Sequence, residues 1–307
     1  MVLDRPISNG ALSRQIEAKI ARGAMIDGRK LVVLAGSNGP YSHRCETIGP
    51  ILGLPCINGG VAVGIGLDYL FLRWERLLRP GDVVYLPMEP TQYSHRRLEN
   101  TLGADAAILF RHDWQDLAAL PADRWLGAAF SGDFRAMLLS GIEQSVSLLR
   151  PGHFDREADF NQSGDRVGHV AALGVGIARL RAMRPLSPTV AQIAQGYGTG
   201  LIAGFTDRTT ARGVIVIGGL STGFLDAALS DGQIAAMRAP YAEHGGGFLI
   251  LTNRSRYPRE AFFDSDSHLN ETAQIAHSRR IAAALLAMLP APQLVAKVSS
   301  ADSLVPP

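Results

Sequence analysis

The chain has few cysteines, almost no excess of charge and no long hydrophobic run. Cys45 and Cys56 are its only two cysteines in 307 residues, too few for a disulfide framework and without the spacing of a structural zinc site. We therefore expect two reduced thiols. The 30 basic and 28 acidic residues give a net charge of +2, and the basic residues are scattered. No nucleic-acid partner or anionic membrane surface is expected.

No segment approaches the roughly 18 consecutive apolar residues of a membrane helix. Residues 1–23 lack both the apolar core and the small-residue cleavage site of a secretory signal. As written, the sequence predicts a cytoplasmic protein with no membrane span, and a start further upstream would make a periplasmic location compatible with it. The content of 47% hydrophobic residues is enough for a full core.

Short apolar runs alternate with helical patterns at both ends of the chain. The predicted strands are residues 30–35, 55–58, 83–86, 213–217 and 248–251. The predicted helices are residues 11–22, 43–52, 67–78, 231–244 and 271–288. This alternation favours an α/β fold with a parallel sheet covered on both faces.

The middle of the chain, from about residue 96 to residue 212, is less regular. It contains helical patterns at 134–149 and 167–184, and its one strand-like run is 106–110. We interpret it as an insertion or helical subregion within a single domain that spans residues 1–307.

Two polar residues follow the first and the last predicted strands. Ser37 comes directly after the first strand, and His268 comes after the last one. In an open parallel sheet, ligands gather at the carboxyl ends of the strands, where residues far apart in sequence meet. A serine nucleophile needs a base, and an imidazole needs a carboxylate to hold its tautomer. Asp264 and Asp266 are both close enough in sequence to do this, and the pattern does not choose between them.

The same residues also have a structural interpretation. Serine and aspartate are common helix N-caps, so Ser37 could cap a helix, and residues 264–268 (DSDSH) could begin one. On the local pattern alone, both interpretations stay open.

Three segments, in this order, resemble the conserved blocks of the SGNH (GDSL-like) hydrolase superfamily. They are residues 33–38 (VLAGSN), 57–60 (INGG) and 266–270 (DSHLN). The resemblance implies a flavodoxin-like, three-layer α/β/α domain with a parallel central sheet, and it implies acyl-transfer chemistry. Residues 81–89 (GDVVYLPME) and 262–270 (FFDSDSHLN) resemble a divergent branch, found with bacterial exopolysaccharide and cellulose biosynthesis clusters.

The resemblance also assigns roles to residues. Ser37 would be the nucleophile and the first oxyanion donor, Gly60 the second donor through its backbone N–H, and His268 the base. The orienting carboxylate would be Asp264 or Asp266.

The third block of the family departs from its pattern in this chain. It normally places an asparagine side chain in the oxyanion hole, but residues 87–93 (PMEPTQY) contain none. Loss of one such donor typically costs about 100- to 1000-fold in rate. Asn38, Gln92 or a backbone amide would have to replace it, and Glu89 would line the pocket or hold substrate hydroxyls.

A second serine has a motif of its own. Residues 219–223 (GLSTG) fit G-x-S-x-G around Ser221, and residues 244–247 (HGGG) imitate a lipase oxyanion motif. That motif should precede the nucleophile, however, and too little chain follows Ser221 for an α/β-hydrolase. Residues 245–247 more simply end a helix before a strand.

No cofactor or metal is expected. The glycines of 60–66 and 174–179 do not complete G-x-G-x-x-G, and the histidines lack the spacing of metal ligands. The sequence predicts a serine esterase or acyltransferase that acts on an acyl ester, such as O-acetyl, of a carbohydrate or polysaccharide. The alternative is a catalytically degenerate scaffold that binds polysaccharide or a polysaccharide-synthase partner.

Overall fold

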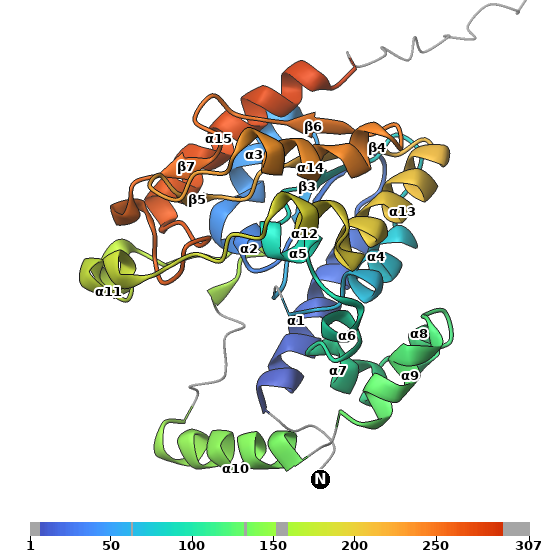
Figure 1. Cartoon of the computed structure of the whole chain (residues 1–307), viewed down its shortest axis with the longest axis vertical. Coiled ribbons are helices and arrows are strands. Elements are labelled where there is room, and N and C mark those ends of the chain that lie inside the picture. The colour runs from blue at the N-terminus through green and yellow to red at the C-terminus, as the bar shows by residue number, and fades with distance from the viewer. Residues whose placement is uncertain (1–6, 63, 132–133, 152–158, 291–307) are drawn as a thin grey trace, which may run out of the picture.

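A five-stranded, all-parallel sheet forms the centre of the protein (Figure 1). The computed structural model describes residues 7–62, 64–131, 134–151 and 159–290. The strand order is β2-β1-β3-β4-β6, the order of flavodoxin-like sheets. These strands are β1 (Leu31–Val33), β2 (Cys56–Asn58), β3 (Val83–Leu86), β4 (Ile215–Gly219) and β6 (Gly247–Leu249). All five predicted strands are confirmed.

Helices cover both faces of the sheet. Successive side chains of a strand point to opposite faces, and here the side chains on both faces are apolar and must be covered. Leu31, Val33 and Tyr85 pack on one face with residues of α3 (Cys45–Leu52) and α15 (Glu271–Met288). Val32 and Val84 lie in the larger core on the other face. The helices contributing to that core include α1 (Ile7–Ala24), α4 (Leu67–Glu75), α13 (Tyr197–Ala211) and α14 (Asp231–Ala242). The predicted three-layer α/β/α architecture is confirmed.

The strand predicted at residues 106–110 is wrong, because α7 (Asp105–Arg111) occupies this segment. Periodicity cannot distinguish a short apolar run in a strand from one in a buried helix. Here the buried Asp105 carboxylate accepts a hydrogen bond from the Gly66 backbone N–H at 2.9 Å and pairs with Arg124. These contacts fix the first turn of the helix.

Most of the middle region is helical. Its elements are α5 (Pro90–Tyr93), α6 (Arg97–Thr101), α8 (Trp114–Leu117), α9 (Ala122–Ala129), α10 (Phe134–Leu149), η2 (Ala171–Leu173), α11 (Ile177–Ala182) and α12 (Val190–Ala194). The prediction at 134–149 is confirmed, but only η2 and α11 are helical within 167–184. Gly176, with φ of 81°, separates them, a conformation that favours glycine.

Cys45 and Cys56 form a disulfide, so the prediction of two reduced thiols is wrong. The chain leaves α3 through Gly53, with φ of 64°, and returns as β2. This reversal brings the two Cα atoms to 5.1 Å, inside the range that a disulfide bridges. The sequence contains only these two cysteines, and their spacing alone did not predict that they would meet.

A second, two-stranded sheet holds the loops near the last strand end. It pairs β5 (Gly223–Phe224) with β7 (Arg256–Tyr257) in parallel. Strands of two residues are too short to leave a period in the sequence, and this sheet was not predicted. Its residue Phe224 packs with Phe262 and Leu269, beside the segment that carries His268.

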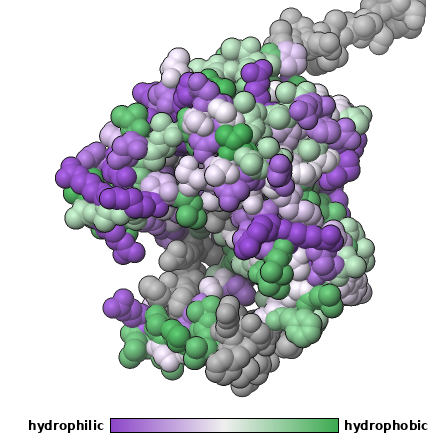
Figure 2. All heavy atoms as spheres, in the orientation of Figure 1, coloured by the Kyte–Doolittle hydropathy of each residue, from purple (hydrophilic) through white to green (hydrophobic). Residues whose placement is uncertain are grey.

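The surface mixes polar and apolar side chains (Figure 2). Within the described ranges, no helix has the length and apolar character to cross a membrane. Apolar side chains are exposed along α10, at the lower edge of the view, and include Leu138, Leu139, Ile142, Leu148 and Leu149.

Candidate active site

Three segments meet at the carboxyl edge of the sheet. Ser37 follows β1, Glu89 follows β3, and His268 lies in the loop that leads into α15. In the observed order, β2 lies on one side of β1 and β3 lies on the other, so the strand order reverses between β1 and β3. Such switch points are where parallel sheets open a crevice for ligands.

Ser37, His268 and Asp264 form a hydrogen-bonded triad. Ser37 Oγ lies 2.7 Å from His268 Nε2, and His268 Nδ1 lies 2.6 Å from Asp264 Oδ1. An ionised carboxylate only accepts hydrogen bonds, so Nδ1 carries the proton of the neutral ring. Nε2 is then the acceptor and the Ser37 hydroxyl the donor. This is the arrangement in which an imidazole can remove a serine proton.

The hydroxyl of Ser37 does not cap the helix that it precedes. Ser37 is the N-cap residue of α2 (Asn38–Ser42), but its side chain makes no capping hydrogen bond. The N-cap of α15 is Asn270, whose side chain accepts from the Ala273 N–H at 3.1 Å. Asp264 and His268 therefore lie ahead of that helix start, and the capping interpretation fails for both segments.

Tyr41 fixes the plane of the imidazole, a contact that the sequence reasoning missed. Its ring stacks on His268 with centroids 4.0 Å apart and an angle of 8° between planes. Tyr41 lies four residues after Ser37, so one turn of α2 places the Ser37 hydroxyl and the stacking ring on the same side. That spacing was the available signal.

Close backbone packing explains the glycines of the second segment. A Cβ on Gly60 would come within 2.9 Å of Gly36 O, and one on Gly39 would come within 3.0 Å of Gly60 Cα. The Gly60 backbone N–H donates to Asn58 Oδ1 at 3.2 Å. The predicted second oxyanion donor thus lies beside α2, with its N–H already engaged by a side chain.

Asn38 and Gln92, the two candidate replacements for the missing asparagine, are held by the backbone. Asn38 Nδ2 donates to Pro87 O at 2.8 Å, which ties the turn after β1 to the end of β3. Gln92 Oε1 accepts from the Glu89 backbone N–H at 3.0 Å. Both side chains are buried, and these two contacts position Ser37 and Glu89.

Glu89 occupies the end of β3 with its carboxyl largely removed from water. Burial raises its pKa to about 7; His268 opposes the shift, Asp266 adds to it, and hydrogen bonds from the Asn38 backbone and Ser267 oppose it. Glu89 Oε1 is buried with no hydrogen-bond partner. A carboxyl of this kind is about half protonated at neutral pH, and its neutral form can donate a hydrogen bond.

A cavity of about 440 Å³ opens beside the triad. Its walls include Glu89, Thr91, Ser221, Arg256, Asp266 and Ser267. Burial lowers the pKa of Arg256 to about 10, and the Asp266 carboxylate opposes that shift. Of the two candidate carboxylates, Asp264 therefore contacts the imidazole, whereas Asp266 lines this cavity with Arg256.

The Ser221 constellation does not assemble. Ser221 lines the cavity and is 2% exposed, but His268, the base that it would need, is hydrogen-bonded to Ser37. His244 of the lipase-like motif follows α14 and lies 3.4 Å from Asp207 Oδ1 through its Nδ1. Gly245, with φ of 76°, follows that helix, so residues 245–247 end a helix as expected. Among the described residues, no group of three or more histidine, cysteine or acidic side chains is arranged to hold a metal.

No protein-family model matches the chain, and comparisons with curated proteins and with solved structures find no match either.

Proposed function

We propose that the protein is a serine esterase or acyltransferase that works through Ser37, His268 and Asp264. The observation that carries the proposal is the unbroken chain of hydrogen bonds from the Ser37 hydroxyl through both ring nitrogens to the Asp264 carboxylate. Ser37 and His268 are both partly exposed, so a substrate can reach them. A helix cap or a core histidine would not need this alignment.

The chemistry proceeds in two halves. His268 Nε2 takes the hydroxyl proton while Ser37 Oγ attacks the ester carbonyl carbon, and the tetrahedral intermediate then expels the alcohol, which receives that proton from His268. Water or a sugar hydroxyl next attacks the acyl-enzyme and gives its proton to His268. Ser37 is regenerated as the acid or the new ester leaves. Esterase and transferase differ only in this last acceptor.

Charge on the carbonyl oxygen must be stabilised during both halves. The Ser37 N–H at the start of α2 is one donor, since first-turn amides have no partner within the helix. Glu89, in its protonated form, is the second: its buried Oε1 has no protein partner, and its raised pKa keeps a proton available near neutrality. Gly60 contributes only if its hydrogen bond to Asn58 is shared.

The cavity and the resemblance to SGNH hydrolases support a proposal for the substrate class. The cavity presents hydroxyl, carboxyl and guanidinium groups, from Thr91, Asp266 and Arg256 among others, which suit the hydroxyls of a sugar better than a purely apolar ester. We propose an acyl ester, such as O-acetyl, on a carbohydrate or polysaccharide. The disulfide between Cys45 and Cys56 favours an oxidising compartment, the periplasm, over the cytoplasm.

The alternative is a scaffold that binds polysaccharide or a synthase partner without catalysis. The hydrogen bond from the Gly60 N–H to Asn58 Oδ1 supports it, because an oxyanion hole with an occupied donor is weaker. The two functions differ in whether Ser37 reacts.

The test is release of p-nitrophenol from its acetate ester. Ser37→Ala should lower the rate to background while circular dichroism and the melting temperature stay those of the wild type. Ser221→Ala tests the competing motif: Ser221 lines the cavity, so its loss should act on KM while turnover through Ser37 remains. Loss of turnover in Ser221→Ala but not in Ser37→Ala would refute the assignment.

A further inference from the structure

A second cavity, larger than the one beside Glu89, is lined by Tyr41, the residue that stacks on the imidazole. Its volume is about 780 Å³, within the range of small-molecule sites. The inner side of α1, the start of α2, residues 61–62 and the loop of residues 160–166 form its walls. The apolar part includes Leu12, Tyr41, Val61 and Phe160.

Every charged side chain that lines this cavity in the described part of the chain is basic. They are Arg14, Lys19, Arg22 and Arg166. Arg166 is paired with Asp159 and Arg14 has an interaction of its own, so the local excess of positive charge rests on Lys19 and Arg22. Such a field favours anions.

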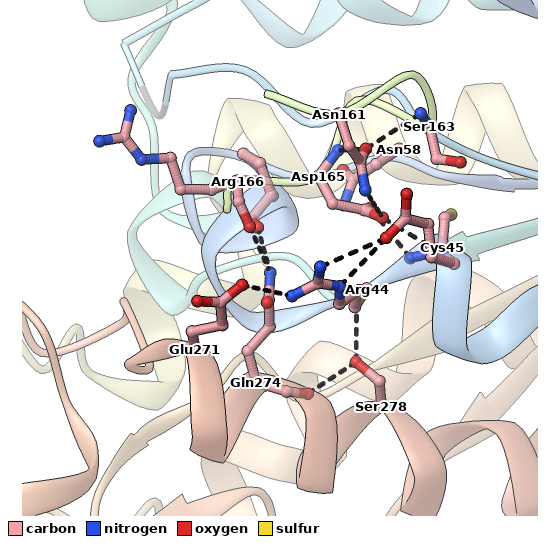
Figure 3. Close-up of polar contacts among 12 residues, drawn as sticks. Arg44, Cys45, Asn58, Asn161, Ser163, Asp165, Arg166, Glu271, Gln274 and Ser278 are labelled. Atoms are coloured by element: carbon pink, nitrogen blue, oxygen red, sulfur yellow. Dashed lines mark hydrogen bonds and ion pairs between the residues drawn. The ribbon is translucent and has the colours of Figure 1, made fainter. Parts of the chain in front are cut away.

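Asp165, an acid beside the cavity, makes its hydrogen bonds elsewhere. Asp165 accepts from the backbone N–H groups of Cys45 and Glu46 and from the side chains of Asn58 and Asn161. Figure 3 shows its carboxyl turned toward Cys45 and Asn58, while the neighbouring Arg166 extends the opposite way. Its oxygens therefore hold the start of α3, not the basic side chains.

Two other acids near the cavity, in the described part of the chain, have partners as well. Asp159 pairs with Arg166, and Glu143 accepts hydrogen bonds from the N–H and the hydroxyl of Ser8 at 3.0 and 2.6 Å. Lys19 and Arg22, in contrast, donate to neutral acceptors, Gly60 O at 2.5 Å and Gln162 Oε1 at 2.8 Å.

Lys19 is the most unusual of the four. It is 4% exposed, its ammonium lies 5.3 Å from the centroid of Phe160, and burial lowers its pKa to about 7 while Asp165 opposes that shift. A buried lysine without a contacting carboxylate is costly. A bound anion would remove that cost.

We infer that this cavity is a binding site for an organic anion, one with a phosphate or carboxylate group on an apolar or aromatic body. Lys19 and Arg22 contact the anionic group, and Tyr41 and Phe160 contact the body. Arg166, whose guanidinium lies 5.6 Å from the Tyr41 centroid and 5.7 Å from that of Phe160, holds the two rings. The site does not depend on the triad being catalytic.

The ligand would lie one aromatic ring from the base, since Tyr41 lines the cavity and stacks on His268. Lys19 also links the cavity to the second glycine segment through Gly60 O. An anionic molecule, or an anionic part of a substrate, would therefore lie next to the triad but outside the 440 Å³ cavity that Glu89 lines.

Calorimetric titration of the full chain tests this. Phenyl phosphate and benzoate should bind saturably, at about millimolar affinity or better, and benzyl alcohol, which lacks the charge, should not. Saturable binding of either anion supports the inference. Above about pH 7, binding should take up protons, because an anion favours charged Lys19.

Lys19→Met and Arg22→Gln should each weaken binding by about tenfold or more. Arg181→Gln, which removes the same charge from an exposed side chain on α11, should not. Ser37→Ala should bind the anions as the wild type does, so the binding result does not depend on the outcome of the esterase assay. No saturable binding of either anion, equal binding of benzyl alcohol, or unchanged affinity in both Lys19→Met and Arg22→Gln would overturn the inference.

Discussion

The pH dependence of the reaction should be set on its alkaline side by Glu89. If the neutral carboxyl is an oxyanion donor, activity requires the protonated form, and the pKa of about 7 places the decline within the working range of the assay. Because burial raises this pKa, the proton is present below about pH 7 and lost above it. At about pH 8 roughly a tenth of the molecules keep it, so kcat/KM should fall about tenfold per pH unit.

Two substitutions separate this role from a structural one. Glu89→Gln keeps a neutral donor of nearly the same shape at every pH, so it should retain most of the activity at about pH 6 and show no alkaline decline. Glu89→Ala removes the donor and should lose about 100- to 1000-fold in kcat/KM throughout. The assay is hydrolysis of p-nitrophenyl acetate from about pH 5.5 to 8.5, with the rate of Ser37→Ala subtracted as background.

The reasoning is refuted if the alkaline decline persists in Glu89→Gln, or if Glu89→Gln loses as much activity as Glu89→Ala at about pH 6. Labelling of Ser37 by a fluorophosphonate in each variant shows whether the nucleophile itself is intact. A decline that follows the loss of labelling would belong to the triad and not to Glu89.

Three further outcomes are expected. Asp264→Asn should lower kcat by about 1000- to 10,000-fold in the same ester assay, because the ring loses the partner that fixes its tautomer. Asp266→Asn should act mainly on KM. Equal effects of the two substitutions on kcat would mean that neither residue orients the ring. Burial lowers the pKa of His43 from 6.5 to about 4, so acid protonates the unfolded chain first, and His43 should contribute about 3 kcal/mol to the fall in unfolding free energy, measured with urea, between those pH values. Burial also lowers the pKa values of His169 and His277, which add to the fall, so His43→Gln should show a smaller fall than the wild type; a pH-independent value, or an equal fall in His43→Gln, would contradict this. Breaking the disulfide by Cys45→Ala with Cys56→Ala, which releases a link across 11 positions, should lower the free energy of unfolding by about 2 to 3 kcal/mol, and an unchanged urea midpoint would contradict this.

The sheet was predictable from the sequence because its strands are buried on both faces. Runs such as residues 83–86 (VVYL) are apolar throughout, end in polar or glycine-rich turns and alternate with helical patterns, and it is this combination that favours buried parallel strands. The same argument failed for residues 106–110, where an equally apolar run forms α7. Its length and composition did not distinguish the two, and the deciding contacts of Asp105 are with residues far away in sequence.

The meeting of Ser37 and His268 could be predicted because strand ends in a parallel sheet share one edge. The choice of Asp264 over Asp266 could not, because it depends on how the loop between η3 (Arg259–Ala261) and α15 folds back. There, Phe262 and Leu269 form an isolated bridge, which places residues 264 and 268 side by side. The disulfide and the stacking of Tyr41 depend in the same way on tertiary packing.

The central claim is that Ser37 is an activated nucleophile, and covalent labelling tests it most directly. The wild-type protein, treated with a fluorophosphonate and digested, should carry the label on the peptide that contains Ser37, and His268→Ala should prevent it, since an unassisted serine hydroxyl does not react. Absence of label from Ser37 in the folded wild-type protein, or label on Ser221 instead, would contradict the account.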